Sequence, residues 1–376
     1  NLDVKTIEKY KSIFNIIDED DSGSIDEEEL REALHKVNLD GNLDAVYILI
    51  GNEERKDLDF VSFLIMMKLL KEQALAQEWD NAMRHYGFAV VVGHPVAGTQ
   101  TDNLYRATRE FFESNSPKEK QTFNHGPYGN PLGGYTGLGV ESVGTTWELD
   151  NAPPDIVESY VFLGSPECWA TREPNVAHPM ALEHIAAPYV EQVMSLCRGI
   201  HRLSARALGV PDTFFENFFD STSASELSLR LAYYPPTESH SMHRTSIRYG
   251  AHTDYTGYTF LYQDPNDLGN EESGGLQVLV NDQWVFVPSV PNSFVINAGD
   301  LWPIWSNGRW KSAVHRVTNP AEDSRYSRQS RISIPFFTGP RGDSLIEPIV
   351  RDGEDKIFSA IEAGQHLQAK LSASNV

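Results

Sequence analysis

Residues 249 to 258, with the sequence YGAHTDYTGY, place a histidine and an aspartate two positions apart in a stretch that is typical of a β-strand. Alternate side chains along a strand point to the same face, so His252 and Asp254 can bind one metal ion. His315, in the later β-type run SAVHRV, can supply a third ligand. Two histidines and one carboxylate form the triad that holds non-haem iron(II) and leaves coordination positions open for chemistry. A His-x-Asp pair by itself also occurs on ordinary polar surfaces, so the surrounding sequence has to decide between the two interpretations.

A second pair of polar residues lies on another β-type run, SRISIPFF. Arg331 and Ser333 are also two apart, so a guanidinium and a hydroxyl group can face the same way and bind a carboxylate. Tyr234, in the run AYYPP, can add a third hydrogen-bond donor. A carboxylate clamp near a metal triad favours the functional interpretation over the surface one.

The C-terminal half of the chain consists mostly of short β-type runs separated by Gly, Pro, Asn and Asp. In chain order these runs are LSLRLAYY, TGYTFLYQ, GGLQVLV, QWVFVP, SFVINAG, SAVHRV and RISIPFF. Short strands at such spacing predict a β-sandwich or barrel. Before them the sequence predicts a strand within residues 87–96, a helix over 101–114, a glycine-rich loop over 126–139 and a long helix over 179–208.

The N-terminal segment contains the acidic stretch DEDDSGSIDEEE at residues 18–29, between predicted helices at 5–16 and 27–37. An EF-hand loop needs oxygen ligands at its positions 1, 3, 5, 7, 9 and 12 and a glycine at position 6. Gly23 occupies position 6, and the predicted calcium ligands are Asp18, Asp20, Ser22, Ser24 through its carbonyl, Asp26 through water, and Glu29. Ser22 departs from the usual Asp or Asn. The alternative interpretation is a solvated acidic helix start.

A weaker copy of this unit follows, with a predicted helix at 43–50 and a long helix from 61 to about 85. Aligning Leu58 with Ile25 puts Gly51, Lys56 and Ser62 at positions 1, 6 and 12, so this second loop cannot hold calcium. We expect it to pair with the first loop through a short β-bridge. No Gly or Pro interrupts the long helix before Tyr86, which predicts a stiff junction between an EF-hand pair at 1–73 and a larger domain at 74–376.

Composition limits the partners and the location of the chain. A net charge of −22 argues against nucleic acid or an anionic membrane as a partner. The longest apolar run, residues 60–70, is too short to span a bilayer. Two cysteines, Cys168 and Cys197, favour a reducing compartment, and we expect a cytoplasmic monomer. Because the sequence begins at Asn1 and not at methionine, it leaves room for a targeting segment that was removed.

The motifs AHTDYT, GGLQVLV, NAGDLWPIWSNGRWKSAVHRV and RISIPFF, in this order, resemble the isopenicillin N synthase-like family of iron(II) and 2-oxoglutarate-dependent dioxygenases. The resemblance covers roughly residues 75 to 340. It implies an α+β fold, with a distorted double-stranded β-helix (jelly roll) supported by the helix at 179–208 and preceded by a small all-α EF-hand domain. Many relatives have Asn where this chain has Ala232, so the polar environment of the co-substrate differs here.

The resemblance assigns roles to the residues already singled out. His252, Asp254 and His315 would bind iron, and Arg331, Ser333 and Tyr234 would bind the distal carboxylate of 2-oxoglutarate. In the family, dioxygen and 2-oxoglutarate are consumed and succinate and carbon dioxide are released. The chain is therefore interpreted as an oxygenase that hydroxylates, desaturates or cyclises a small molecule, with possible modulation by calcium. Two alternatives stay open, namely an iron oxidase that does not use 2-oxoglutarate and a calcium-sensing adaptor with an inert oxygenase fold.

Several other residues near these motifs have two interpretations. For Trp302, Trp305, Trp310, Phe336 and Phe337, core packing is expected over a place in a substrate pocket. Arg244 and Arg248 precede the ligand strand and can meet an anionic substrate. Surface pairing with the many acids of this chain is the role expected of them.

Overall fold

The computed structural model describes residues 4–36, 47, 57–124, 133–146, 153–170, 177–219, 225–237 and 247–373. The chain divides into two compact units, Asn1–Glu78 and Trp79–Val376. Helix α4 (Phe60–His85) continues without interruption through this boundary, as its sequence free of Gly and Pro predicts. None of the helices in the described part of the chain has the length and apolarity that a membrane span requires.

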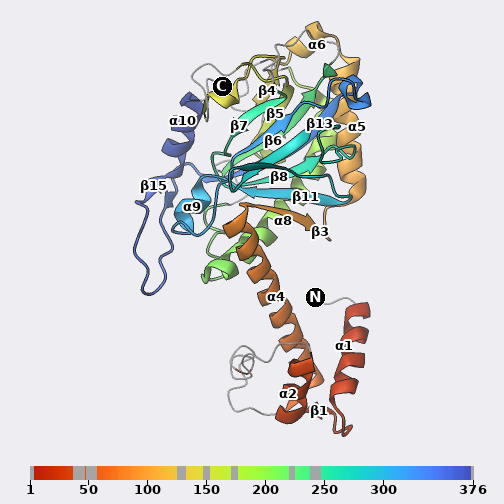
Figure 1. Cartoon of the computed structure of the whole chain (residues 1–376), viewed down its shortest axis with the longest axis vertical. Helices are drawn as coiled ribbons and strands as arrows, with labels where there is room; N and C mark the ends of the chain where they lie inside the picture. Colours follow the sequence, from red (N-terminus) through yellow and green to blue (C-terminus); the bar gives the residue numbers. More distant parts are fainter. Residues whose placement is uncertain are drawn as a thin grey trace. The chain divides into compact units, whose positions relative to one another are not determined.

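The N-terminal unit is a helix-loop-helix arrangement (Figure 1). Helices α1 (Val4–Ile17) and α2 (Glu27–Lys36) flank the acidic loop, and strand β1 (Ser24–Ile25) pairs antiparallel with β2 (Leu58–Asp59). Ile25 lies opposite Leu58, which confirms the predicted bridge between the two loops. Residues 43–46 and 48–56, which contain most of the predicted second helix and loop, lie outside the described residues. The core of the unit consists of Tyr10, Phe14, Ile25, Leu30, Leu34, Tyr47, Leu58, Phe63 and Met66.

The larger unit contains two large β-sheets (Figure 1) and a two-stranded sheet formed by β14 (Leu345–Ile346) and β15 (Ile361–Glu362). The strands of the seven-stranded sheet, in spatial order, are β3 (Phe88–Val92), β11 (Ser293–Ala298), β8 (Tyr258–Gln263), β13 (Arg331–Arg341), β6 (Ser225–Tyr234), β5 (Glu158–Leu163) and β4 (Gly133–Thr136). Those of the four-stranded sheet are β10 (Gln283–Phe286), β9 (Gly275–Val280), β12 (His315–Thr318) and β7 (Tyr249–His252). All seven β-type runs predicted in the C-terminal half contain strands.

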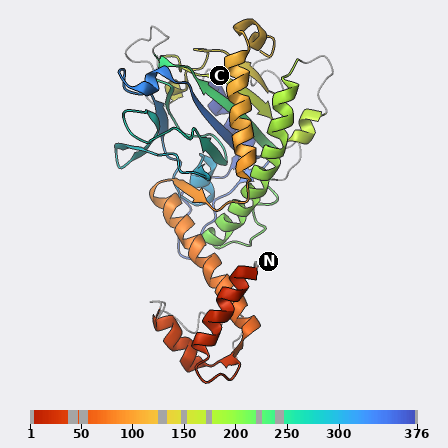
Figure 2. The same cartoon turned by 90° about the vertical axis from the view of Figure 1, so that its right-hand side faces the viewer.

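Two long helices cover one face of the seven-stranded sheet. Helices α5 (Gly98–Ser114) and α8 (Met180–Leu208) lie side by side (Figure 2). Their apolar residues join those of the sheet in one core, which includes Leu104, Tyr189, Phe260 and Ile334. Gly209 ends α8 with a φ of 77°, a left-handed conformation that glycine adopts without steric cost. The opposite face of the sheet is therefore left for the four-stranded sheet and the space between them.

The remaining elements are short, apart from the last helix. They are α6 (Pro117–Gln121), a 3₁₀ turn (Val143–Thr146), α7 (Pro166–Ala170), α9 (Leu301–Trp305), a 3₁₀ turn (Arg325–Arg328), β14 (Leu345–Ile346), β15 (Ile361–Glu362) and α10 (Ala363–Ala373). Helix α10 lies near the C-terminus.

The glycine-rich stretch at 126–139 is not entirely loop, which corrects the prediction made from its composition. Its residues 133–136 form β4, which pairs antiparallel with β5 at the edge of the large sheet. Gly133 has a φ of 92°, and a Cβ atom there would collide with the Val161 carbonyl oxygen. Glycine thus permits the close strand pairing that a larger residue would prevent.

Candidate active site

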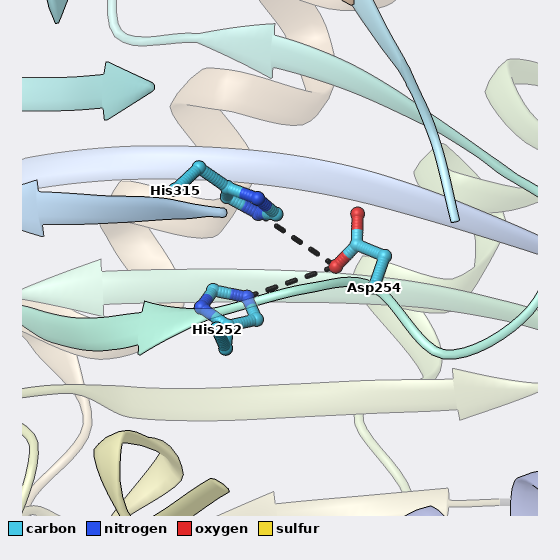
Figure 3. Close-up of side chains that lie close together, drawn as sticks. All are labelled: His252, Asp254 and His315. Atoms are coloured by element: carbon cyan, nitrogen blue, oxygen red, sulfur yellow. Dashed lines mark ion pairs between the residues drawn. The ribbon is translucent and has the colours of Figure 1, made fainter. Parts of the chain in front are cut away.

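Two neighbouring strands of the small sheet bring the predicted metal ligands together. His315, the first residue of β12, lies opposite His252, the last residue of β7. Asp254 lies two residues beyond the end of β7, outside the strand on which it was predicted, and its Oδ1 is 3.7 Å from the Nε2 atom of each histidine (Figure 3). One potential ligand atom of each residue lies within 4.8 Å of the others. Residues far apart in sequence thus form one compact and buried cluster.

The hydrogen bonds of the two histidines fix which ring nitrogen is free to bind a metal. Nδ1 of His252 donates to the Gly250 carbonyl at 2.9 Å, and Nδ1 of His315 donates to the Ala313 carbonyl at 3.1 Å. A carbonyl can only accept, so the proton of each neutral ring is on Nδ1 and the lone pair is on Nε2. Burial lowers the pKa of His252, and the nearby His315 lowers it further. Both effects favour the neutral form that metal binding needs.

Two buried side chains orient the carboxylate of Asp254. Its Oδ2 accepts hydrogen bonds from Thr259 Oγ1 at 2.5 Å and Asn297 Nδ2 at 2.6 Å. Oδ1 is therefore the oxygen that faces the histidines. The sequence analysis did not single out Thr259 or Asn297, although an amide directly after the apolar residues FVI of strand β11 was a usable signal. Two neutral imidazoles and one oriented carboxylate are a donor set that fits iron(II).

The predicted carboxylate clamp is assembled on β13 and β6. Arg331 lies opposite Tyr234 in the strand pairing, and its Cζ is 5.1 Å from the centroid of the Tyr234 ring. The hydroxyl groups of Tyr234 and Ser333 are 3.3 Å apart. Arg331 is 3% exposed, and its buried Nη1 has no hydrogen-bond partner among the described residues. An unsatisfied buried guanidinium nitrogen near two hydroxyl groups fits the carboxylate of 2-oxoglutarate.

Two charged residues lie beside the clamp; the sequence analysis did not single out Asp267, and it expected a surface role for Arg248. Arg331 donates through Nε and Nη2 to Asp267, with the Nη2–Oδ2 distance at 2.8 Å. Asp267 lies in the polar loop sequence DPNDLGN, where a surface acid is the ordinary expectation. Arg248 is only 2% exposed, so the surface role expected of it is wrong. Burial lowers the pKa of Arg248 to about 10, and the charge of Arg331 contributes to this shift. Arg244 lies outside the described residues.

A cavity of about 490 Å³ lies between the two sheets and includes the three candidate metal ligands. Ser333, Pro335 and Phe337 line it, whereas Ile332, Ile334 and Phe336 belong to the core on the other face of β13. The expectation of core packing is thus confirmed for Phe336 and wrong for Phe337, because alternate residues of a strand face opposite sides. Trp302, Trp305 and Trp310 are buried in the core, as expected.

The cavity wall is mostly apolar, with a few polar groups. The C-terminal helix α10 contributes Gly364, Leu367, Gln368 and Leu371. Arg230 also lines the cavity, but it donates to Glu141 at 2.7 Å and to the Tyr249 hydroxyl at 2.9 Å. The charge of Arg230 is therefore balanced within the protein.

Comparison with known proteins agrees with this geometry. Residues 225–340 match the model of the 2OG-Fe(II) oxygenase superfamily, residues 59–178 match that of the non-haem dioxygenase in morphine synthesis N-terminal domain, and residues 9–40 match that of the EF-hand domain. A homoarginine-6-hydroxylase of Glycine max is 30% identical over 311 residues, which cover 79% of this chain and 88% of the relative. One from Oryza sativa subsp. japonica is 29% identical over 325 residues, with the same coverage of both chains.

Solved structures give the same result. A full-length Neurospora crassa protein, crystallised with alpha-KG and thymine, has a TM-score of 0.65 and 26% identity, and the match covers 82% of this chain and 92% of that one. JOX2 in complex with 2OG, Fe and JA has a TM-score of 0.64 and 25% identity, and the match covers 79% of this chain and 81% of that one. The chain belongs to the 2OG-Fe(II) oxygenase superfamily. It is a 2-oxoglutarate-dependent dioxygenase with a jelly-roll fold, and this class of enzyme uses Fe(II), 2-oxoglutarate and dioxygen.

Proposed function

We propose that His252, Asp254 and His315 hold the iron(II) ion. The observation that carries the proposal is the position of both Nε2 atoms at 3.7 Å from Asp254 Oδ1, with each Nδ1 atom bonded to a backbone carbonyl. We also propose that Arg331 Nη1, Ser333 and Tyr234 bind the distal carboxylate of 2-oxoglutarate. The unsatisfied Nη1 atom supports this second assignment.

With dioxygen present, iron and 2-oxoglutarate supply the oxidising power to attack an unactivated C–H bond. The protein contributes binding, orientation and exclusion of water. Gly250 and Ala313 keep the histidine lone pairs directed at the metal, and Thr259 and Asn297 hold the carboxylate of Asp254. Apolar walls around the cavity limit the access of water to the reacting atoms.

The proposed substrate is a small molecule that is hydroxylated, desaturated or cyclised in this cavity. A volume of about 490 Å³ is in the range of small-molecule sites. The related proteins include hydroxylases of homoarginine and proline, which favours hydroxylation among the three reactions. A monomeric enzyme in the cytoplasm remains our expectation.

The decisive experiment measures conversion of 2-oxoglutarate to succinate by iron-loaded protein prepared without oxygen and then exposed to air. Asp254→Ala removes the carboxylate ligand, and Asp323→Ala, at an exposed position, is the matched control. We expect succinate from the wild type and the control and none from Asp254→Ala. No succinate from wild type that has bound iron would contradict the proposed roles of these residues and favour an oxidase or an inert fold.

For the N-terminal unit, we propose that the loop at 18–29 binds calcium and that the second loop does not, within an EF-hand pair at 1–73 joined to an oxygenase domain at 74–376. Carboxylate oxygens of Asp18, Asp20 and Glu29 lie within 4.8 Å of one another. Gly23 has a φ of 87°, as the sharp turn of an EF-hand loop requires. Ser22, Ser24 and Asp26 are the remaining proposed ligands.

Calcium is proposed to modulate oxygenation. The test compares kcat and KM with calcium and with a calcium chelator at fixed iron concentration. Constants that differ between the two conditions would support modulation. Equal constants would show that the EF-hand unit has only a structural role.

A further inference from the structure

The clamp arginine is already paired with an acid in this chain. Asp267 accepts hydrogen bonds from Nε and Nη2 of Arg331. The side chain of Asp267 is 6% exposed and that of Arg331 is 4% exposed. This buried ion pair is electrically neutral. A second carboxylate placed beside it would lose its hydration and find no net positive charge, which is costly in a buried site.

A second buried arginine, Arg248, lies near this pair. It is 2% exposed, and its Nη1 makes a long contact of 3.5 Å to the carbonyl of Ser273, whose Oγ accepts a hydrogen bond from the N–H of Leu268, the neighbour of Asp267. The buried Nε of Arg248 has no hydrogen-bond partner among the described residues. Arg248 therefore adds a second positive charge near one ion pair, and each arginine keeps an unsatisfied donor. An excess positive charge that is buried with unsatisfied donors fits an anionic ligand.

A nearby acid, Asp264, has partners of its own. It accepts hydrogen bonds from the Tyr105 hydroxyl at 2.9 Å and from the Ile332 backbone N–H at 2.9 Å. It also lies 3.9 Å from Arg109, which pairs more closely with Glu113, at 3.1 Å.

We propose that Arg248 is a second arginine of the co-substrate pocket, which provides the net positive charge for the distal carboxylate of 2-oxoglutarate because Asp267 neutralises Arg331. Arg331 Nη1, Ser333 and Tyr234 form the hydrogen bonds to that carboxylate. This inference rests on the proposed 2-oxoglutarate site. It adds that the charge balance among Arg248, Arg331 and Asp267 sets the affinity for a dicarboxylate.

The test is calorimetric titration of protein loaded with Mn(II) in place of iron, so that binding is measured without turnover. Two ligands are compared, namely 2-oxoglutarate and 2-oxopentanoate, which has the same chain length but no distal carboxylate. Arg248→Met removes the charge and keeps an unbranched, flexible side chain, and Arg351→Met, at an exposed position, is the matched control. The double variant Arg248→Met/Asp267→Asn removes one cation and one anion together.

We expect Arg248→Met to weaken 2-oxoglutarate binding by roughly ten- to a hundredfold, the range of a lost charge-assisted interaction. Binding of 2-oxopentanoate should not change, and the double variant should recover most of the lost affinity. Unchanged 2-oxoglutarate binding in Arg248→Met would overturn the inference. So would a double variant as weak as the single one, or an equal loss for both ligands, because either result indicates a structural role.

Two further measurements keep the test decisive. If Arg248→Met does not fold, Asp267→Asn alone is informative, since it increases the net positive charge and should bind 2-oxoglutarate at least as tightly as wild type. Weaker binding by Asp267→Asn would count against the inference. Wild-type protein that binds Mn(II) but not 2-oxoglutarate would refute the proposed co-substrate site itself, a failure distinct from that of Arg248.

Discussion

The orientation of Asp254 by Asn297 gives a quantitative prediction for metal binding. Asn297→Ala removes one of the two donors to Asp254 Oδ2, the one at 2.6 Å, and leaves Thr259 as the other. Hydrogen bonds to charged groups contribute about 1.5–3 kcal/mol, and loss of such a partner of a metal ligand typically weakens metal affinity by roughly 10- to 100-fold. The two ranges agree, because about 1.4 kcal/mol corresponds to a factor of ten in affinity.

The variant separates ligand orientation from overall stability. The assay is an anaerobic titration with Fe(II), together with thermal unfolding of the metal-free protein. Asn103→Ala, at an exposed position on α5, is the matched control. Folded Asn297→Ala with wild-type iron affinity would refute the argument that this hydrogen bond orients the ligand.

Three further predictions concern other parts of the chain. Glu29→Gln should lower calcium affinity by at least roughly tenfold, measured by calorimetry, since it removes a charged ligand. Gly250→Ala should lower the melting temperature and iron affinity, because its Cβ would lie 2.7 Å from the Gly144 nitrogen beside the strand of His252. Burial lowers the pKa of His201 to about 3, so stability is lost as the pH falls below about 6.5, where only the unfolded chain takes up the proton. Between pH 7.5 and 5.5, the free energy of unfolding of His201→Phe should therefore fall by about 1.4 kcal/mol less than that of the wild type, measured by urea unfolding.

Each of these three has an outcome that contradicts it. Calcium affinity unchanged in Glu29→Gln would argue against the EF-hand assignment of that residue. A Gly250→Ala protein with wild-type melting temperature would mean that the backbone at Gly144 can move away from the added Cβ atom without a measurable loss of stability. An equal loss of stability with pH in wild type and His201→Phe would mean that His201 is not the group responsible.

The sequence alone determined the parts of this protein that depend on short-range spacing. Arg331 and Ser333, an i and i+2 pair, both lie on β13 as predicted. His252 and Asp254 lie close together as predicted, although β7 ends at His252 and Asp254 lies beyond the strand. The EF-hand loop at 18–29 could be predicted for the same reason, because its ligands lie at fixed positions within twelve consecutive residues. The same spacing also predicts the face of β13 on which Phe337 lies, because Ser333, Pro335 and Phe337 are every second residue of one strand.

Only the tertiary structure decided which side chains these residues meet. Asp267 and Arg248 belong to segments distant in sequence from Arg331; the sequence analysis expected a surface position for Arg248 and did not single out Asp267. Burial of both, and the pairing of Asp267 with Arg331, follow from the register of β13 against its neighbours and from the position of the loop before β9. The same holds for Asn297, which reaches Asp254 because β11 and β8 are adjacent in the sheet. Charge balance in a buried site depends on such long-range pairing, which sequence spacing does not encode.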